Sequence, residues 1–346
     1  MAKLNSSTTL ARSLALLTAP TYTGTESDDF LLAGWGSFSE LTHDPIVVRG
    51  GAGNDFIVGG SSTGDALAGD AGNDVIYGDS LPLLEAFVKG GDDLLNGGKG
   101  DDKLYGQGGN DQLAGGDGND QLFGGFGDDF LYDDQGQDVL NGGAGNDTYF
   151  YDSTSNGGVM VDLSKGVAYS DATGSNQLVS IENIVAGLGN DYLVGDSQAN
   201  VIFGYGGADI IVGGAGSDTL AYGQASDSTV NAFDTVYGFD FGANGDKFQF
   251  ADQAIDSVGT SSLTLNAGSN VSLGSALSLI LRPSAIYGGG LEDNQAQLVI
   301  IEKGGLAEHY MVVDGNNLAG FQSDGDYVIQ LVGALNMAAF GTSDFV

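Results

Sequence analysis

The stretch GGKGDDKLYGQGGNDQLAGGDGNDQLFGGFGDDFLYDDQGQDVLNGGAGNDTYF, residues 97–150, decides the fold of this chain. It consists of six nine-residue units that follow one another without a gap, and each unit carries a carboxylate at its sixth place. A leucine or a tyrosine follows each carboxylate by two residues. A period this strict indicates an architecture in which every unit adopts the same structure.

A single unit predicts a turn followed by a short strand. The glycine-rich half tolerates positive φ, and the Asn or Asp beside the acid tolerates the left-handed region as well. The last three residues are too few for a helix and suit a strand whose middle side chain points inward. We therefore expect an all-β fold: a parallel β-roll or β-helix in which two units complete one lap, with carboxylates along both edges and leucines inside.

The stacked carboxylates of such a coil repel one another, so they need a cation. Carboxylate and turn carbonyl oxygens, in a chain with no Cys and only two His, form a hard-oxygen site. Such a site suits Ca²⁺ better than Zn²⁺ or Cu²⁺, and Mg²⁺ loses its water less readily. A disordered linker would explain the Gly and Asp content but would not require a leucine every ninth residue.

The units match the pattern GGxGxDxUx, in which U is a large apolar residue. The chain therefore resembles the RTX family of calcium-binding, type I-secreted proteins over residues 50–221. The resemblance implies several Ca²⁺ ions per chain. It extends into residues 222–346, which are similar to C-terminal regions of RTX surface proteins, including the group called bluetail. The ending Asp344-Phe345-Val346 also resembles an uncleaved type I secretion signal.

The acid place of the repeat recurs outside residues 97–150. A worn copy begins at Gly24, a copy from Gly59 contains one extra residue, and a second block occupies residues 187–221. Asn200 takes the acid place once, so we expect a weaker site or none there. The predicted metal ligands are Asp29, Asp55, Asp65, Asp74, Asp93, Asp102, Asp111, Asp120, Asp129, Asp138, Asp147, Asp191, Asn200, Asp209 and Asp218.

The repeat pattern predicts five segments. The first is a docking segment in which Leu10, Leu14 and Leu17 suggest one short helix. Residues 35–49 and 80–88 interrupt the first repeat block. The segments are an N-terminal docking segment 1–23, a first repeat block 24–150, a β spacer 151–186, a second repeat block 187–221, and a C-terminal antiparallel, sandwich-like β domain 222–346.

The composition excludes several partners and suggests where the chain acts. With 10 basic and 46 acidic residues the net charge is −36, which argues against binding nucleic acid or an anionic membrane. No apolar stretch is long enough to span a membrane, and Leu14 to Ala19 is too short for a good signal-peptide core. We expect an extracellular, cell-surface protein secreted without a cleaved N-terminal signal.

No catalytic residues are predicted. The chain contains no HExxH motif, and only about 23 residues precede the first worn repeat, too few for a catalytic domain. The string GSSTG at residues 60–64 matches GxSxG by letters, but it lies in a repeat turn without the strand and helix of a nucleophile elbow. We therefore expect a protein that is not an enzyme and that has no cofactor other than Ca²⁺.

Two functions remain open at this stage. The first is a secreted structural protein that folds on binding Ca²⁺ and assembles with copies of itself into a surface layer, filament or matrix. The alternative is a calcium-dependent adhesin or carbohydrate-binding module that presents Tyr287 or Tyr310 to a cell-surface polysaccharide. Within either function, Asp227 lies outside the repeats, and we expect its replacement to matter much less than that of Asp111 or Asp120.

Overall fold

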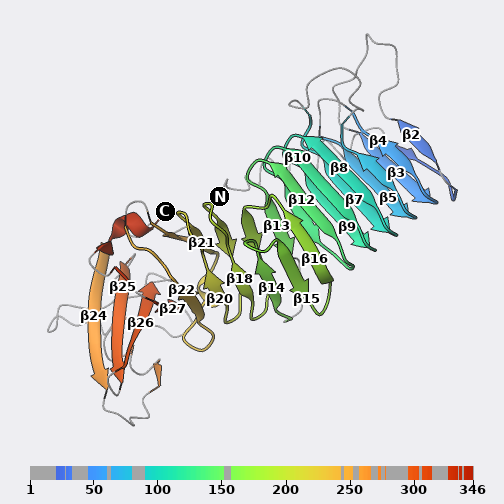
Figure 1. The fold of residues 1–346 in the computed structure, drawn as a ribbon. Helices are drawn as coiled ribbons and strands as arrows, with labels where there is room; N and C mark the ends of the chain where they lie inside the picture. Colours follow the sequence, from blue (N-terminus) through green and yellow to red (C-terminus); the bar gives the residue numbers. More distant parts are fainter. Residues whose placement is uncertain are drawn as a thin grey trace. The chain divides into compact units, whose positions relative to one another are not determined.

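The computed structural model describes most of the chain and resolves two compact units (Figure 1). The N-terminal unit comprises Met1–Asp152 and Gly166–Ile181, and the C-terminal unit comprises Ser153–Lys165 and Glu182–Val346. The predicted docking helix, most of the interruption at 35–49 and all of that at 80–88 lie outside the described residues. The residues that the structure describes are 21–27, 29–32, 46–60, 64–79, 90–151, 157–242, 245–251, 257–265, 272–273, 277, 295–303, 306–313, 326–333, 335–336 and 339–345.

The N-terminal unit is a solenoid of two parallel sheets, and successive repeats alternate between them. This arrangement confirms the predicted all-β parallel β-roll with two repeats per lap. The first sheet contains, in spatial order, β1 (Thr21–Thr23), β3 (Val47–Ala52), β5 (Ala66–Ala71), β7 (Leu94–Lys99), β9 (Gln112–Asp117), β11 (Phe130–Asp133) and β13 (Thr148–Tyr151). The second contains β2 (Phe30–Leu32), β4 (Phe56–Val58), β6 (Val75–Tyr77), β8 (Lys103–Gly108), β10 (Gln121–Phe126) and β12 (Val139–Ala144).

The interior of this solenoid is a stack of leucines held in register. Leu122 of β10 pairs with Leu104 on one side and with Leu140 on the other. In the facing sheet, Leu113 pairs with Leu95 and Leu131. All six side chains are buried. The eighth place of each repeat therefore builds the core, as the sequence predicts.

Glycine is required in the turns because neighbouring laps approach closely. Gly100 has φ +122° and Gly118 has φ +155°, in the region that L side chains rarely adopt. A Cβ atom at Gly118 would also lie only 1.8 Å from the carbonyl oxygen of Gly100 in the preceding lap. The glycine half of the repeat thus sets the spacing between laps.

The spacer contributes one further lap to the N-terminal unit. Strand β16 (Gly174–Val179) continues the second sheet in parallel beside β12, and Leu178 pairs with Leu140. Strand β15 (Val167–Ser170) pairs with β16 in an antiparallel hairpin. These residues lack the glycine period but keep the inward-facing apolar side chain.

The C-terminal unit continues the repeat architecture and adds a mixed sheet. One sheet contains β17 (Asn183–Val185), β19 (Val201–Phe203), β21 (Thr219–Tyr222) and β23 (Lys247–Phe250). The other begins with β14 (Val159–Asp162), β18 (Tyr192–Val194), β20 (Ile210–Val212) and β22 (Asp234–Tyr237). It continues through β27 (Tyr327–Val332), β26 (Leu306–Val313), β25 (Gln295–Lys303) and β24 (Ser257–Leu265).

The last four strands differ in one respect from the antiparallel domain that the sequence suggests. Strands β25, β26 and β27 are antiparallel, whereas β24 runs parallel to β25 and β27 runs parallel to β22. The described strands extend the solenoid sheet through β22. Strand alternation alone does not reveal this, because an alternating strand suits a parallel or an antiparallel neighbour.

The end of the chain packs against the C-terminal unit. Asp344 is fully buried and accepts hydrogen bonds from the backbone N–H groups of Gly242, at 2.7 Å, and Gly341, at 2.8 Å. The Phe345 ring lies 6.2 Å from that of Phe248. Asp344 and Phe345, the described part of the segment that resembles a secretion signal, are therefore packed in the folded protein. In the part of the chain that the structure describes, no helix is long and apolar enough to cross a membrane.

The leucine stack makes a testable prediction about stability. Leu113→Ala should lower the free energy of unfolding by about 2–5 kcal/mol, because it opens a cavity between laps. Leu94→Ala is the control: Leu94 lies on the neighbouring strand with its side chain 45% exposed, so its loss should cost about 0.5 kcal/mol or less. Urea unfolding of the Ca²⁺-loaded protein measures both, and equal losses would contradict the proposed core.

Candidate metal centre

The predicted ligands lie at the edges of the solenoid, each just before a strand that points the next apolar residue inward. Glycine residues form the turn before the acid, and the neighbouring lap covers the acid side chain. Asp29 alone is partly exposed, whereas all the other predicted ligands, Asn200 included, are buried.

The buried acids form hydrogen-bonded ladders along the edges. On one edge of the N-terminal unit, the backbone N–H of Asp102 donates to Oδ1 of Asp120 at 2.7 Å, and that of Asp120 donates to Oδ1 of Asp138 at 2.8 Å. On the other edge, the N–H of Asp111 donates to Oδ1 of Asp129 at 2.8 Å, and that of Asp129 to Asp147 at 2.9 Å. Each acid therefore binds the backbone of the lap before it.

The second carboxylate oxygen has no protein partner in most of these acids. Leaving a buried polar atom without a partner costs about 1–3 kcal/mol, and more when it is charged. A row of such atoms needs a cation. Within the described residues, buried Oδ2 atoms without a hydrogen bond belong to Asp74, Asp93, Asp102, Asp111, Asp120, Asp129, Asp191, Asp209 and Asp218.

Main-chain oxygens border the same spaces as these Oδ2 atoms. A Cβ atom at Gly106 would lie 2.2 Å from Oδ2 of Asp111 and 2.7 Å from the carbonyl oxygen of Gly124. Among the described residues, no three Asp, Glu, His or Cys side chains are grouped so that they could hold a metal ion by themselves. A cation would therefore be held jointly by carboxylates and carbonyl oxygens of neighbouring laps, a donor set that fits Ca²⁺.

Burial also changes the acidity of the ladder in the absence of metal. Burial raises the pKa of Asp93 to about 10 and that of Asp111 to about 8, and neighbouring carboxylates add to the effect. It raises the pKa of Asp102 and of Asp138 to about 7. The metal-free ladder therefore carries protons near neutral pH, and a bound cation displaces them.

Three predicted ligands use their oxygens within the protein. Oδ2 of Asp65 accepts a hydrogen bond from Gly60 N–H at 2.6 Å, and Oδ2 of Asp29 accepts one from Thr25 N–H at 2.5 Å. Asn200 donates from Nδ2 to the Glu182 carbonyl at 2.7 Å, and its Oδ1 accepts from Asp196 N–H at 2.8 Å. The arrangement at Asn200 agrees with the weaker or absent site expected there.

The structure adds three ladder members that the sequence analysis missed. Oδ1 of Asn176 accepts from Asp138 N–H at 2.9 Å, Oδ1 of Asp234 from Asp209 N–H at 3.0 Å, and Oδ1 of Asp246 from Asp218 N–H at 3.0 Å. The glycine half of the repeat is incomplete before Asn176 and Asp246, where Gly174 and Gly242 remain, and is absent before Asp234. The remaining signal was an Asp or Asn followed two residues later by a buried apolar residue, as in every repeat.

Asp227 is also more deeply involved than the sequence suggests. It is 1% exposed, and its Oδ2 accepts hydrogen bonds from Gly223 N–H at 2.7 Å and Gln224 N–H at 3.0 Å. Its Oδ1 has no partner in the described structure. Burial raises the pKa of Asp209, and the charges of Asp234 and Asp227 add to this rise. The structure therefore argues against the expectation that replacing Asp227 matters much less than replacing Asp111 or Asp120, because the short turn Ala225–Asp227 places a buried carboxylate near Asp209.

At the spacer hairpin of the N-terminal unit, the ladder ends in a network of side-chain hydrogen bonds and not in a carboxylate oxygen without a protein partner. Asp133 stands where other repeats have glycine, and it is buried. It accepts hydrogen bonds from Tyr149 Oη at 2.5 Å, from Thr173 Oγ1 at 2.9 Å, and from Asn176 Nδ2. Both oxygens of Asp133 therefore have protein partners.

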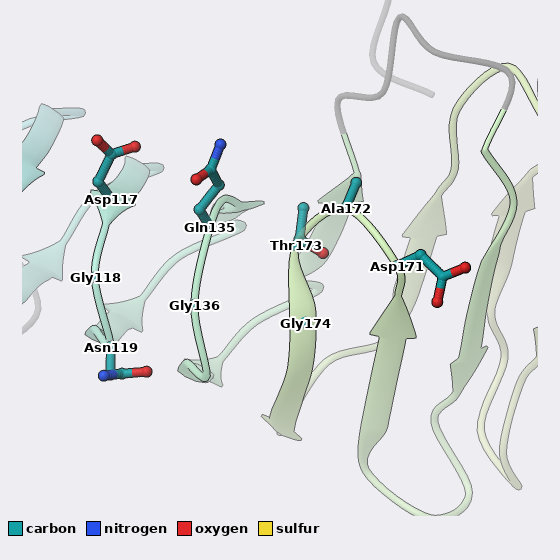
Figure 2. A pocket seen from close by; sticks show the side chains of 9 residues that line it. All are labelled: Asp117, Gly118, Asn119, Gln135, Gly136, Asp171, Ala172, Thr173 and Gly174. Carbon is teal, nitrogen blue, oxygen red and sulfur yellow. The ribbon is translucent and has the colours of Figure 1, made fainter.

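A shallow hollow of about 440 Å³ lies beside this network on the surface of the N-terminal unit. Figure 2 shows the side chains of Asp117, Asn119, Gln135 and Asp171 around it, carried by three successive turns. Its lining contains no aromatic ring and no basic group. The hollow thus offers hydrogen-bonding groups without the stacking surface that sugar-binding sites use.

Replacing ladder acids tests the metal centre. Asp111→Ala and Asp227→Ala should each lower the apparent Ca²⁺ affinity about tenfold or more, because each removes a buried carboxylate oxygen from the ladder. Asp171→Ala is the control, since Asp171 is exposed in the β15–β16 turn. Calcium titration followed by circular dichroism measures all three, and an unchanged affinity in Asp111→Ala would contradict the assignment.

The raised pKa values predict opposite pH effects with and without metal. A folded-state pKa above the ordinary 3.8 means that the metal-free fold gains stability as pH falls from about 8 toward 4. Calcium competes with these protons, so the Ca²⁺-loaded fold should lose stability over the same range. Melting temperatures in EGTA and in Ca²⁺ at several pH values measure this, and parallel pH trends would refute it.

A comparison with protein families accounts for this repeat. A family model described as RTX calcium-binding nonapeptide repeat (4 copies) matches residues 47–63, 60–80, 88–122, 114–149 and 185–220. No curated protein matches the chain significantly. The matched segments contain most of the acid ladder, and RTX nonapeptide repeats bind multiple Ca²⁺ ions, which confirms the predicted cofactor. Over these segments the chain carries the calcium-binding nonapeptide repeats of the RTX family.

Proposed function

We propose that this protein is a secreted structural protein that folds when it meets Ca²⁺ outside the cell and then assembles with copies of itself into a surface layer, filament or matrix. The observation that carries the proposal is the row of buried carboxylate oxygens without protein partners. Because the folded state presents these oxygens and the unfolded chain does not hold them together, binding free energy becomes folding free energy.

The composition supports folding that depends on metal. The chain has no cysteine, so no disulfide constrains it. Its charge of −36 opposes compaction at low Ca²⁺ concentration, and extracellular calcium modules typically respond at about 10⁻⁴ to 10⁻³ M. A chain of this kind stays extended until it reaches a calcium-rich compartment.

The docked C-terminus supports a type I route of export. A transport machine that reads the last residues needs them accessible, whereas Asp344 is fully buried and bonded in the folded unit. Export before folding, followed by calcium binding outside, satisfies both conditions. The proposed location is therefore the cell exterior, at the cell surface.

The adhesin alternative is less well supported by the described residues. Tyr310 is only 4% exposed, and its ring packs edge-on against Phe233 at 5.8 Å. Its Oη donates to Glu308 at 3.0 Å. Tyr310 is therefore a core residue and does not present its ring to a glycan, and Tyr287 lies outside the described residues.

A structural role is also proposed in preference to catalysis. The buried carboxylates are accounted for by the ladder, and the GSSTG string begins in the turn after β4, where Gly60 N–H donates to Asp65. His309 lies within β26, between the paired strands β25 and β27. These groups already have structural positions in the repeat or the sheet.

The proposal predicts two linked transitions on adding Ca²⁺ to the purified metal-free protein. Circular dichroism should show a gain of β structure, and electron microscopy should then show regular sheets or filaments. EGTA should reverse the folding, and Mg²⁺ at the same concentration is the control expected to give a smaller effect. A protein that folds with Ca²⁺ but stays monomeric at every concentration would contradict the proposed assembly.

A further inference from the structure

Two positions of each repeat have no role in forming the fold. The sixth residue joins the ladder and the eighth faces the core, so the seventh and ninth side chains stand on the outside of each sheet. The fold does not dictate what these residues are. Whether these side chains are apolar, polar or charged therefore indicates what that face of the sheet contacts.

In the C-terminal unit these positions form a continuous apolar surface. Strands β14, β18, β20 and β22 lie side by side and in register (Figure 1). One row across them contains Met160, Tyr192 and Ile210, with exposures of 39%, 43% and 38%. The next row ends at Tyr237, which is 42% exposed. We define the outer patch as Met160, Tyr192, Val194, Ile210, Val212 and Tyr237.

The outer patch carries no charged side chain. Among the described residues of the two rows on these four strands, only Asp162 is acidic; it is buried, and Lys165 pairs with it at the margin. The remaining member, Thr235, is neutral. An uncharged face is unexpected on a chain with a net charge of −36.

The outer patch is not a general property of the repeats. The seventh places of the corresponding sheet in the N-terminal unit include Lys103, Gln121, Val139 and Gln177, which pair in register through β8, β10, β12 and β16. In the other sheet of the C-terminal unit, the outward places include Asn183 and Lys247. Apolar side chains do occupy outward places elsewhere, as in the stacked rings of Phe56, Tyr77, Tyr105 and Phe123, but Lys103 lies among the outward places of that sheet. The outer patch is thus distinguished by its lack of an exposed charged side chain.

Where this face of the sheet continues beyond β22, other residues of the same chain bury it. Beyond β22, the outward side chains of β27, β26 and β25 include Val328, Val312 and Val299, which are fully buried. They form a core cluster that the chain covers with Val230, Phe233, Leu273 and Leu277. Over β14 to β22 the described residues leave the face exposed.

We propose that the outer patch is a self-association surface, on which the outer patch of a second copy packs face to face. The inference deepens the assembly described under the proposed function and rests on it. Two flat sheets pack at about 10 Å when apolar side chains interdigitate. The contact follows two-fold symmetry, because the same patch serves both copies.

Charge selects a second copy over other occupants. Two chains of −36 repel wherever their carboxylate-rich edges meet, so they approach most easily through an uncharged face. An anionic lipid surface or an acidic polymer would need basic groups, and the outer patch has none. Calcium bound along the edges lowers the remaining repulsion, so association should follow calcium loading.

The area of the outer patch sets the strength of the contact. A few hundred Å² of apolar surface is the size of the largest patch on a typical monomer, and it is smaller than the roughly 800 Å² per partner of a stable complex. A single contact is therefore weak, as suits one element of a larger assembly in which several contacts act together.

The test compares face variants with a matched control in the full Ca²⁺-loaded chain. Tyr192→Asn combined with Ile210→Asn should weaken self-association in sedimentation velocity by about tenfold or more, because two apolar side chains leave the contact. Phe130→Asn is the control, since Phe130 holds the same seventh place in the N-terminal unit and is 38% exposed. Circular dichroism verifies that every variant folds with Ca²⁺.

Three outcomes would overturn the inference, and one of them would also contradict the proposed function. If the wild-type protein assembles and the double variant assembles equally well, the interface lies elsewhere while the proposed function stands. If the wild-type protein folds but never associates, both fail. If hydroxyl-radical footprinting finds Tyr192 and Tyr237 protected at concentrations where the protein is monomeric, the chain itself covers the outer patch.

Discussion

Electrostatic repulsion between stacked, buried carboxylates is the constraint on which the rest of this structure depends. In most ladder acids, one oxygen accepts a hydrogen bond from the backbone of the neighbouring lap and the other lies in a space bordered by main-chain carbonyls. Hydrogen bonds within the protein satisfy only half of each group. A divalent cation satisfies the other half, and the turns, the glycines and the lap spacing all follow from making room for it.

The sequence predicts those parts of the fold in which each place of the repeat has a single structural role. The nine-residue spacing of Asp102, Asp111 and Asp120, with a leucine two places later, predicts the lap, the buried core and the edge positions of the acids. Asn176 and Asp234 were missed because the residues before them lack the full glycine pattern of the repeat, and only pairing across the sheet reveals them. The parallel pairing of β24 with β25 was missed because alternation in one strand does not state the direction of its neighbour.

The candidate site was less predictable than the fold for a related reason. Spacing identifies which residues reach an edge, but the use of each oxygen depends on local geometry. The extra residue before Asp65 lets Gly60 N–H occupy its second oxygen, and the turn at Ala225–Asp227 brings Asp227 beside Asp209 and Asp234. The outer patch escaped notice because its paired residues, such as Met160 and Tyr192 or Tyr192 and Ile210, are 18 or more residues apart and become neighbours only through the register of the sheet.

The direction of the ladder gives the solenoid a polarity. The N–H of Asp102 donates to Asp120, that of Asp120 donates to Asp138, and that of Asp138 donates to Asn176, so every lap is completed by the one that follows it. Shortening from the front leaves all later rungs intact. It also leaves the Oδ1 of the first remaining acid without its donor, whereas shortening from the back leaves the last remaining N–H without its acceptor. The two ends of a ladder therefore differ in chemistry: the front presents a hydrogen-bond acceptor and the back presents a donor.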